Sequence, residues 1–290
     1  MLPQEKSELS PAALVKGMVK LVSLPHVCIR VNLMVDDPKY SASEIGEVIS
    51  QDAALTARLL RVANSSFYGF QSKISTISRA VTVIGFRELR DLVVAVSAVR
   101  TFSSIPMDLE NMAAFWRHSI FTGIVSRLLS KHCRILHSER LFVSGVLHDL
   151  GQLVIFHKIP ELANKTLNRV KLTGEELHIA EGTIIGFDHA EIGAELVKSW
   201  NLPKSLEDTI RYHHEPELAV DNPVDTAIVH IANIISDMAE ENETDREKHL
   251  KRIHPAAWQI TGLDEGVIDA IICEAHPLLF EGLALIMPAD

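Results

Sequence analysis

Apolar residues recur at helical spacing along almost the whole chain, and this periodicity limits the fold more than any other feature. The stretch 53–63 is a clear example. In it, Leu55, Leu59, Val62 and Ala63 recur at i, i+4, i+7 and i+8, so they form one apolar stripe on a helix. Because strand-like alternation is rare, the sequence predicts an all-α protein, a multi-helix bundle.

The helices are bounded by proline, glycine or capping residues. We expect them at residues 12–21, 25–35, 41–50, 53–63, 78–84, 87–101, 109–132, 141–147, 153–157, 160–172, 175–184, 189–200, 204–213, 224–239 and 265–280.

Two stretches interrupt this pattern. The strongly charged stretch 240–251 is either a mobile loop or a solvated helix end. The stretch 103–107 contains a proline and shows no periodicity. We expect it to separate an N-terminal helical lobe, residues 1–106, from a second lobe, residues 107–290.

The composition argues against several classes of function. A net charge of −10 opposes binding to nucleic acid or anionic membranes, since both usually need a basic surface. No apolar run approaches the roughly 20 residues that span a bilayer, and the charged N-terminus lacks a signal-peptide core. The three cysteines have no CxxC spacing, which fits a reducing compartment and no thiolate metal site. We therefore expect a cytoplasmic protein that binds neither nucleic acid nor membrane.

The stretch 144–151 places His148 and Asp149 side by side at the end of an apolar helix. An imidazole nitrogen beside a carboxylate oxygen suits a divalent metal such as zinc, iron or manganese. Alternatively, the pair is only a helix end followed by a cap, and any one of fourteen histidines is weak evidence. Four further histidines lie on expected helices or at their starts: His118, His189, His213 and His214.

In order along the chain, these residues and their neighbours resemble the HD superfamily of helical metal-dependent phosphohydrolases. The motifs are WRHS at 116–119, LHDLG at 147–151, DHAEIG at 188–193 and YHHEP at 212–216. Stretches 49–69 and 77–85 are similar to the opening of the HDOD domain, the HD-related output domain of bacterial signalling proteins. The resemblance covers about 24–216, with C-terminal helices beyond, and implies an HD-type metal-binding lobe preceded by an additional N-terminal helical lobe.

The resemblance also implies which residues bind metal: His118, His148, Asp149, His189, His213 and His214. The first matches the first histidine of the HD pattern, and the next two match its central doublet. The last three match the extra histidines of the HD-GYP branch, which binds two or more metals and hydrolyses cyclic di-GMP. Five imidazoles and one carboxylate, which can bridge, suit two divalent ions. Iron or manganese fits best, and zinc is compatible.

The chain departs from that branch in several places. Gln152 replaces a lysine that often follows the doublet and would stabilise phosphoryl charge. The late aspartate of the HD pattern falls on Asn233, a weaker ligand, although Asp237 lies one helical turn later. The GYP sequence, whose loop helps to form the cyclic-dinucleotide pocket, is absent.

The remaining question is how the individual histidines would be used. His213 and His214 are adjacent, so on a helix their side chains point about 100° apart. Each would serve one of two metals, or one of them would support the other ligands. His157, His178 and His230 match no motif, and we expect them to be structural.

We expect a bacterial signal-transduction output or regulatory module whose metal centre is structural, vestigial or a sensor of redox state or oxygen. The alternative is a metal-dependent phosphohydrolase acting on a nucleotide or cyclic dinucleotide. A third reading is an oxidative di-iron enzyme. An open, anion-lined cleft would favour hydrolysis, whereas a centre closed by side chains would favour a structural or sensory role. The expected partners are signalling proteins of two-component or cyclic-dinucleotide pathways, a phosphate-containing small molecule, and a second copy of the chain.

Overall fold

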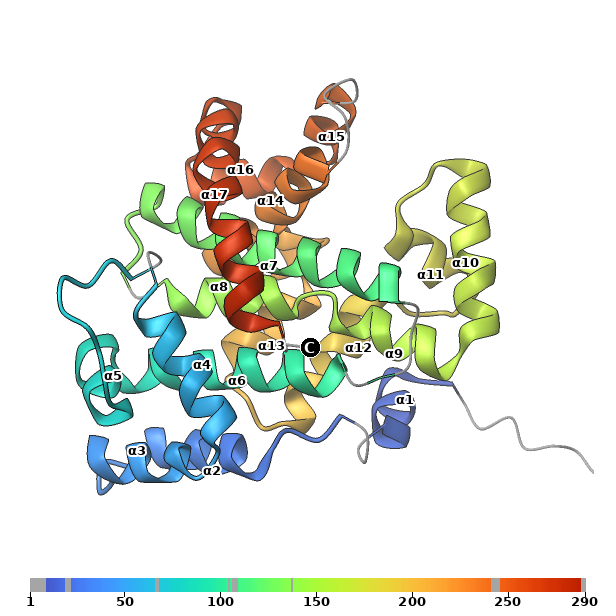
Figure 1. The fold of residues 1–290 in the computed structure, drawn as a ribbon. Coiled ribbons are helices and arrows are strands. Elements are labelled where there is room, and N and C mark those ends of the chain that lie inside the picture. Colours follow the sequence, from blue (N-terminus) through green and yellow to red (C-terminus); the bar gives the residue numbers. More distant parts are fainter. Residues whose placement is uncertain are drawn as a thin grey trace, which may run out of the picture.

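The computed structural model describes residues 9–18, 22–65, 68–103, 105, 109–136, 138–240 and 246–287. All regular elements in these ranges are helical, which confirms the predicted all-α class (Figure 1). The α-helices are α1 (Pro11–Met18), α2 (His26–Val35), α3 (Ala42–Ser50), α4 (Ala53–Ala63), α5 (Ile77–Ile84), α6 (Phe86–Phe102), α7 (Leu109–His132), α8 (Glu139–Leu147), α9 (Leu150–Lys158), α10 (Pro160–Thr173), α11 (Leu177–Ile184), α12 (His189–Ser199), α13 (Lys204–Arg211), α14 (Pro223–Glu240), α15 (Arg246–Arg252), α16 (Pro255–Thr261) and α17 (Ile268–Ile286).

The expected starts of the helices at 41–50 and 53–63 are confirmed, whereas α9 begins three residues earlier and α11 two residues later than expected. Ser41 begins α3 with a capping box, in which its hydroxyl accepts from the Glu44 backbone N–H and the Glu44 carboxylate accepts in return. Asp52 is the N-cap of α4, and its carboxylate accepts from the Leu55 backbone N–H. The expected lobe boundary at 103–107 falls largely outside the described residues, so the division into two lobes stays a prediction.

The C-terminal part differs most from the expectation. Helix α16 was not predicted, because its seven residues are too few for a periodicity to appear. It begins at Pro255 and ends at Gly262 in the left-handed conformation that favours glycine. Part of the charged stretch forms α15, and the last helix runs six residues further than expected.

The long helix α7 lies at the centre of the helices that follow it in the chain, and it packs against α8, α14 and α17 (Figure 1). Helices α7 and α8 approach closely where Gly123 faces Gly145. A Cβ added to Gly145 would lie 2.6 Å from the Gly123 Cα, so this contact requires glycine. The close approach brings the end of α8 beside the part of α7 that carries His118.

Helix α17 also packs against α4 and α6, so the C-terminal helix contacts elements from both halves of the chain (Figure 1). A cavity of about 580 Å³ lies between α2, α6, α8 and the start of α13. Among the described helices, none combines the length and the apolar character that a membrane span requires.

The cavity contains an unusual carboxyl group, Asp91. Burial raises its pKa from 3.8 to about 6, although Arg90 hydrogen-bonds to it. The folded protein therefore holds this proton more tightly than the unfolded chain does. The free energy of unfolding should fall as pH rises from about 4 to about 6, by about 3 kcal/mol from this group. Urea unfolding at several pH values measures this dependence.

In Asp91→Asn we expect this part of the pH dependence to disappear. Asp36→Asn is the matched control, because its carboxylate lines the same cavity but is 61% exposed. An equal slope in wild type and Asp91→Asn would contradict the prediction.

Candidate metal centre

The predicted His–Asp pair forms the junction between two helices. His148 closes α8 and Asp149 precedes the first residue of α9, so the pair occupies a tight turn with no intervening loop. Gly151 lies two residues after Asp149, and its Cα faces the first turn of α12. That contact sets His189, the first residue of α12, opposite Asp149.

Asp149 lies between two groups of histidines. Its Oδ2 atom is 3.2 Å from Nε2 of His148 and 4.0 Å from Nε2 of His118. Its Oδ1 atom is 3.1 Å from Nε2 of His189 and 3.7 Å from Nε2 of His213. One carboxylate oxygen thus faces each group, which is the arrangement of a ligand that bridges two metals.

All six residues predicted from the sequence come together in the structure. Within each of two groups, the ligand atoms lie within 4.8 Å of one another, and the groups are His118, His148 and Asp149, and His189, His213 and His214. Their role as metal ligands stays a prediction that metal analysis tests.

Two of the rings have a fixed tautomer. Nδ1 of His148 lies 2.7 Å from the Gly145 carbonyl, and Nδ1 of His213 lies 2.7 Å from the Ile210 carbonyl. A carbonyl only accepts, so each Nδ1 carries a proton, and each Nε2 would present a lone pair in the neutral ring that metal binding requires. Hydrogen bonds of this kind orient the histidine ligands of metal sites.

Three buried atoms of the centre that could bind a cation have no hydrogen-bond partner in the described part of the chain. Nε2 of His148, Nε2 of His213 and Oδ1 of Asp149 are buried without a hydrogen-bond partner among the described residues. In addition, Nε2 of His148 lies 3.2 Å from a carboxylate oxygen of Asp149. Each unsatisfied buried polar group costs about 1–3 kcal/mol. Their convergence at one point fits a divalent metal with imidazole and carboxylate ligands.

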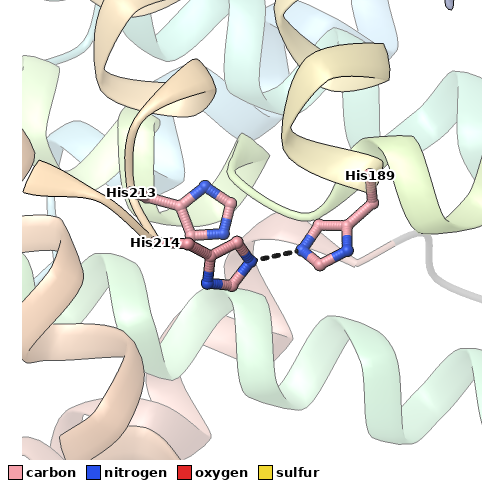
Figure 2. Close-up of side chains that lie close together, drawn as sticks. All are labelled: His189, His213 and His214. Carbon is pink, nitrogen blue, oxygen red and sulfur yellow. Dashed lines mark hydrogen bonds between the residues drawn. The ribbon is translucent and has the colours of Figure 1, made fainter. Parts of the chain in front are cut away.

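His189 is held by a carboxylate that the sequence interpretation missed. Oε2 of Glu181, on α11, accepts from Nδ1 of His189 at 2.6 Å and from the His189 backbone N–H at 2.9 Å. Nε2 of His189 then lies 2.8 Å from Nε2 of His214. Figure 2 marks this contact between the two rings with a dashed line. Two imidazole nitrogens at this distance share either a proton or a metal ion.

Two histidines expected to be structural also contact the centre. The ring of His178, on α11, stacks on His214 with 4.0 Å between centroids. His230, on α14, hydrogen-bonds to the backbone carbonyl of His213 at 2.7 Å. Neither side chain belongs to the two clusters of ligand atoms. That they are structural stays a prediction.

The electrostatics of the centre favour a bound cation. Burial alone would raise the pKa of Asp149, but His148 and His189 hold it well below its usual value. Burial lowers the pKa of His213, and the neighbouring His148 lowers it further. Burial and His213 do the same to the pKa of His214. The carboxylate is therefore charged and these two imidazoles are neutral, as metal ligands must be. Against the effect of burial, neighbouring carboxylates raise the pKa of His118 to about 9 and the pKa of His189 well above its usual value, so these two rings would release a proton on binding metal.

The geometry favours Asn233 over Asp237 as the late ligand of the HD pattern. Oδ1 of Asn233 lies 2.9 Å from Nε2 of His118, the nitrogen that faces Asp149. Oδ1 of Asp237 lies 3.6 Å from Nδ1, on the opposite side of the same ring. Asp237 is thus placed to orient His118, while the amide oxygen of Asn233 faces the candidate metal.

The centre is closed largely by its own side chains. The side chains of His148 and His213 are fully buried, and that of His189 is 2% exposed. Asp149 is 8% exposed and His118 is 14% exposed. Access from solvent is therefore confined to the side of His118 and the half-buried His214.

The amino-acid sequence is similar to a known domain family and to another known protein. The HDOD domain family matches residues 21–216 of the chain. An uncharacterized protein of Treponema pallidum (strain Nichols) is 31% identical over 193 residues. That match covers 66% of this chain and 37% of the relative, so the chain spans little more than a third of the relative's length.

Solved structures of similar fold cover nearly the whole chain. A candidate phosphohydrolase from Shewanella amazonensis SB2B is 27% identical with a TM-score of 0.72, covering 95% of this chain and 98% of its own. An HDOD domain protein of unknown function from Geobacter sulfurreducens is 25% identical with a TM-score of 0.70, covering 95% and 97%. A candidate signal transduction protein from Marinobacter aquaeolei VT8, 18% identical with a TM-score of 0.67, covers 96% and 66% and shares the fold.

Proposed function

The chain belongs to the HDOD domain family, and we propose that it is a bacterial signal-transduction output module with an HD-type dinuclear metal centre. The observation that carries the proposal is the closed cluster of unpartnered ligand atoms around Asp149. A centre closed by its own ligands suits a structural or sensory role better than turnover of a large substrate.

Two ions would be held on either side of Asp149. The first would use His118, His148 and one carboxylate oxygen, with Asn233 as a further ligand. The second would use the other carboxylate oxygen together with the three histidines drawn in Figure 2. A ligand set dominated by imidazole, without thiolate, suits iron or manganese, and zinc is compatible. An iron pair at this position would supply redox chemistry suited to sensing oxygen or redox state.

A metal-dependent phosphohydrolase is the second candidate. It is supported by the similarity to the Shewanella amazonensis protein, which is described as a candidate phosphohydrolase. In such an enzyme, two metals activate water and neutralise the charge that develops on a phosphodiester. The closure of the centre, Gln152 in place of a lysine and Asn233 in place of an aspartate all weigh against this reaction.

The two candidates differ in an assay for metal-dependent hydrolysis. Wild-type protein loaded with Fe²⁺ without oxygen, or with Mn²⁺, is incubated with cyclic di-GMP and with bis(p-nitrophenyl) phosphate. We expect no hydrolysis above that of the His148→Ala variant. Metal-dependent turnover that is lost in His148→Ala would instead establish the phosphohydrolase.

The signalling proposal also implies partners. We propose proteins of two-component or cyclic-dinucleotide pathways, a small phosphate-containing effector, and a second copy of the chain. The family membership supports the signalling partners, because HDOD domains are output domains. The acidic net charge of −10 continues to disfavour nucleic acid.

A further inference from the structure

We propose that the stretch 252–254, beyond the part of the chain that matches the family, couples α15 and α16 to the affinity of the metal centre, with His230 as the positioning residue. The inference rests on the proposed metal centre and adds a means of regulating it. It follows from two contacts, one to each half of the centre.

The first contact is a chain of hydrogen bonds. The backbone N–H of His254 donates to Nε2 of His230 at 2.9 Å. Nε2 is therefore the acceptor, and Nδ1 of His230 donates to the carbonyl of His213 at 2.7 Å. Nδ1 of His213 donates to the Ile210 carbonyl, which leaves Nε2 of His213 facing Asp149. This series of hydrogen bonds thus runs from the start of α16 to a candidate ligand of the second metal.

The position of His213 depends on these bonds. Helix α13 ends at Arg211, so His213 lies in the turn that follows rather than in a regular helix. Its carbonyl is fixed by His230, which is 5% exposed on α14, a long helix packed against α7. His230 is in turn oriented by the backbone of His254. Such supporting hydrogen bonds set the orientation of a metal-binding imidazole.

The second contact reaches the other half of the centre. Nη1 of Arg252 lies 2.8 Å from Oδ2 of Asp237, and Nε lies 2.6 Å from Oε1 of Glu176. The other oxygen of Asp237 lies 3.6 Å from Nδ1 of His118. Arg252 therefore ties α15 to the carboxylate beside His118 and to the residue that precedes α11, the helix that carries Glu181.

These contacts give the C-terminal segment a regulatory consequence. Any partner that displaces α15 and α16 would release Asp237 on one side and the His213 carbonyl on the other. The ligands on both sides of Asp149 would then be less well oriented, and the metal would bind more weakly. Conversely, a bound metal would favour the docked position of α15 and α16, because the coupling between two sites is reciprocal.

The backbone N–H of His254 can be removed selectively. The φ angle of His254 is −61°, a value that proline adopts without strain. His254→Pro removes both the N–H and the side chain, whereas the matched control His254→Ala removes only the side chain. We expect Co²⁺ binding, measured by competition with a chromophoric chelator, to weaken by about 10- to 100-fold in His254→Pro. His254→Ala should bind as the wild type does.

A second pair of variants tests His230 itself. His230→Leu removes both of its hydrogen bonds, and we expect a similar loss of affinity with an altered Co²⁺ absorption spectrum. His230→Asn can place an amide N–H where Nδ1 was but cannot reach the His254 N–H, so it should restore the spectrum in part and bind Co²⁺ with an affinity between those of His230→Leu and the wild type. This pair decides the question if His254→Pro does not fold, as judged by circular dichroism.

The outcomes separate the inference from the proposed function. The coupling is overturned, and the metal centre left intact, if the wild type binds Co²⁺ and the affinity and spectrum are equal in His254→Pro and His254→Ala. The same holds if they are unchanged in all His230 variants. A wild-type protein that binds no Co²⁺ overturns the metal centre and the coupling with it.

Discussion

Asp149→Ala is expected to abolish both metal ions at once. The wild-type protein, purified without chelator or affinity tag, should contain about two equivalents of iron or manganese, as a carboxylate-bridged pair requires. Among the residues that the structure describes, Asp149 is the one whose carboxylate oxygens face both groups of histidines. Its removal deletes a ligand from each ion and the negative charge between them. Elemental analysis of the folded variant measures the loss.

The control is His178→Ala, which removes an imidazole that stacks on His214 without belonging to either cluster of ligand atoms. We expect His178→Ala to retain most of its metal, and His118→Ala to lose one ion preferentially. Full metal content in Asp149→Ala would disprove the bridging role. Absence of stoichiometric metal from the wild type would leave a helical interaction domain without a metal centre.

Gly151→Ala is expected to destabilise the protein and to reduce its metal content. A Cβ at this position would lie 1.9 Å from the backbone carbonyl oxygen of His189, at the contact between α9 and α12. Backbone atoms cannot rotate away, so the two helices must separate. We expect a loss of about 3 kcal/mol in the free energy of unfolding, near the upper end for overpacking. Because the same contact sets His189 opposite Asp149, metal affinity should fall as well.

Gly182→Ala provides the matched control, because a Cβ there meets no atom within 4 Å and the residue lies inside α11. A glycine in a helix costs about 0.5–1 kcal/mol relative to alanine, so this variant should be slightly more stable than the wild type. Urea unfolding of the metal-free proteins separates packing from metal binding. Equal stability of the two variants would show that α9 and α12 tolerate a wider spacing.

Local signals made much of the fold predictable. The apolar periodicity of 53–63 depends only on neighbouring residues, and the helix appears in the structure with the expected bounds. The capping boxes that start α3 at Ser41 and α12 at Asp188 are also local, although only the helices themselves were predicted there. Helix α16 escaped prediction because seven residues span about two turns, too few to show a repeat.

The centre was only partly predictable for a different reason. The ordered motifs identify six side chains that come together, but the groups that orient them are specified by tertiary packing. Glu181 reaches His189 from the preceding helix, and His230 reaches His213 through a backbone carbonyl. Neither contact follows a local periodicity or a motif, so no pattern in the sequence distinguishes these residues from ordinary buried polar ones. The preference for Asn233 over Asp237 likewise depends on how α14 is rotated against α7.

The bridging position of Asp149 has a thermodynamic consequence for the whole chain. Metal ions held between α7, the α8–α9 junction, α12 and the turn after α13 would act as cross-links among segments far apart in sequence. The unfolded chain cannot keep these ligands together, so free metal at a hundred times its dissociation constant would add about 2.7 kcal/mol to folding per ion. The supply of metal in the cell would then set how long the folded protein survives proteolysis, and a change in metal availability would become a change in protein abundance.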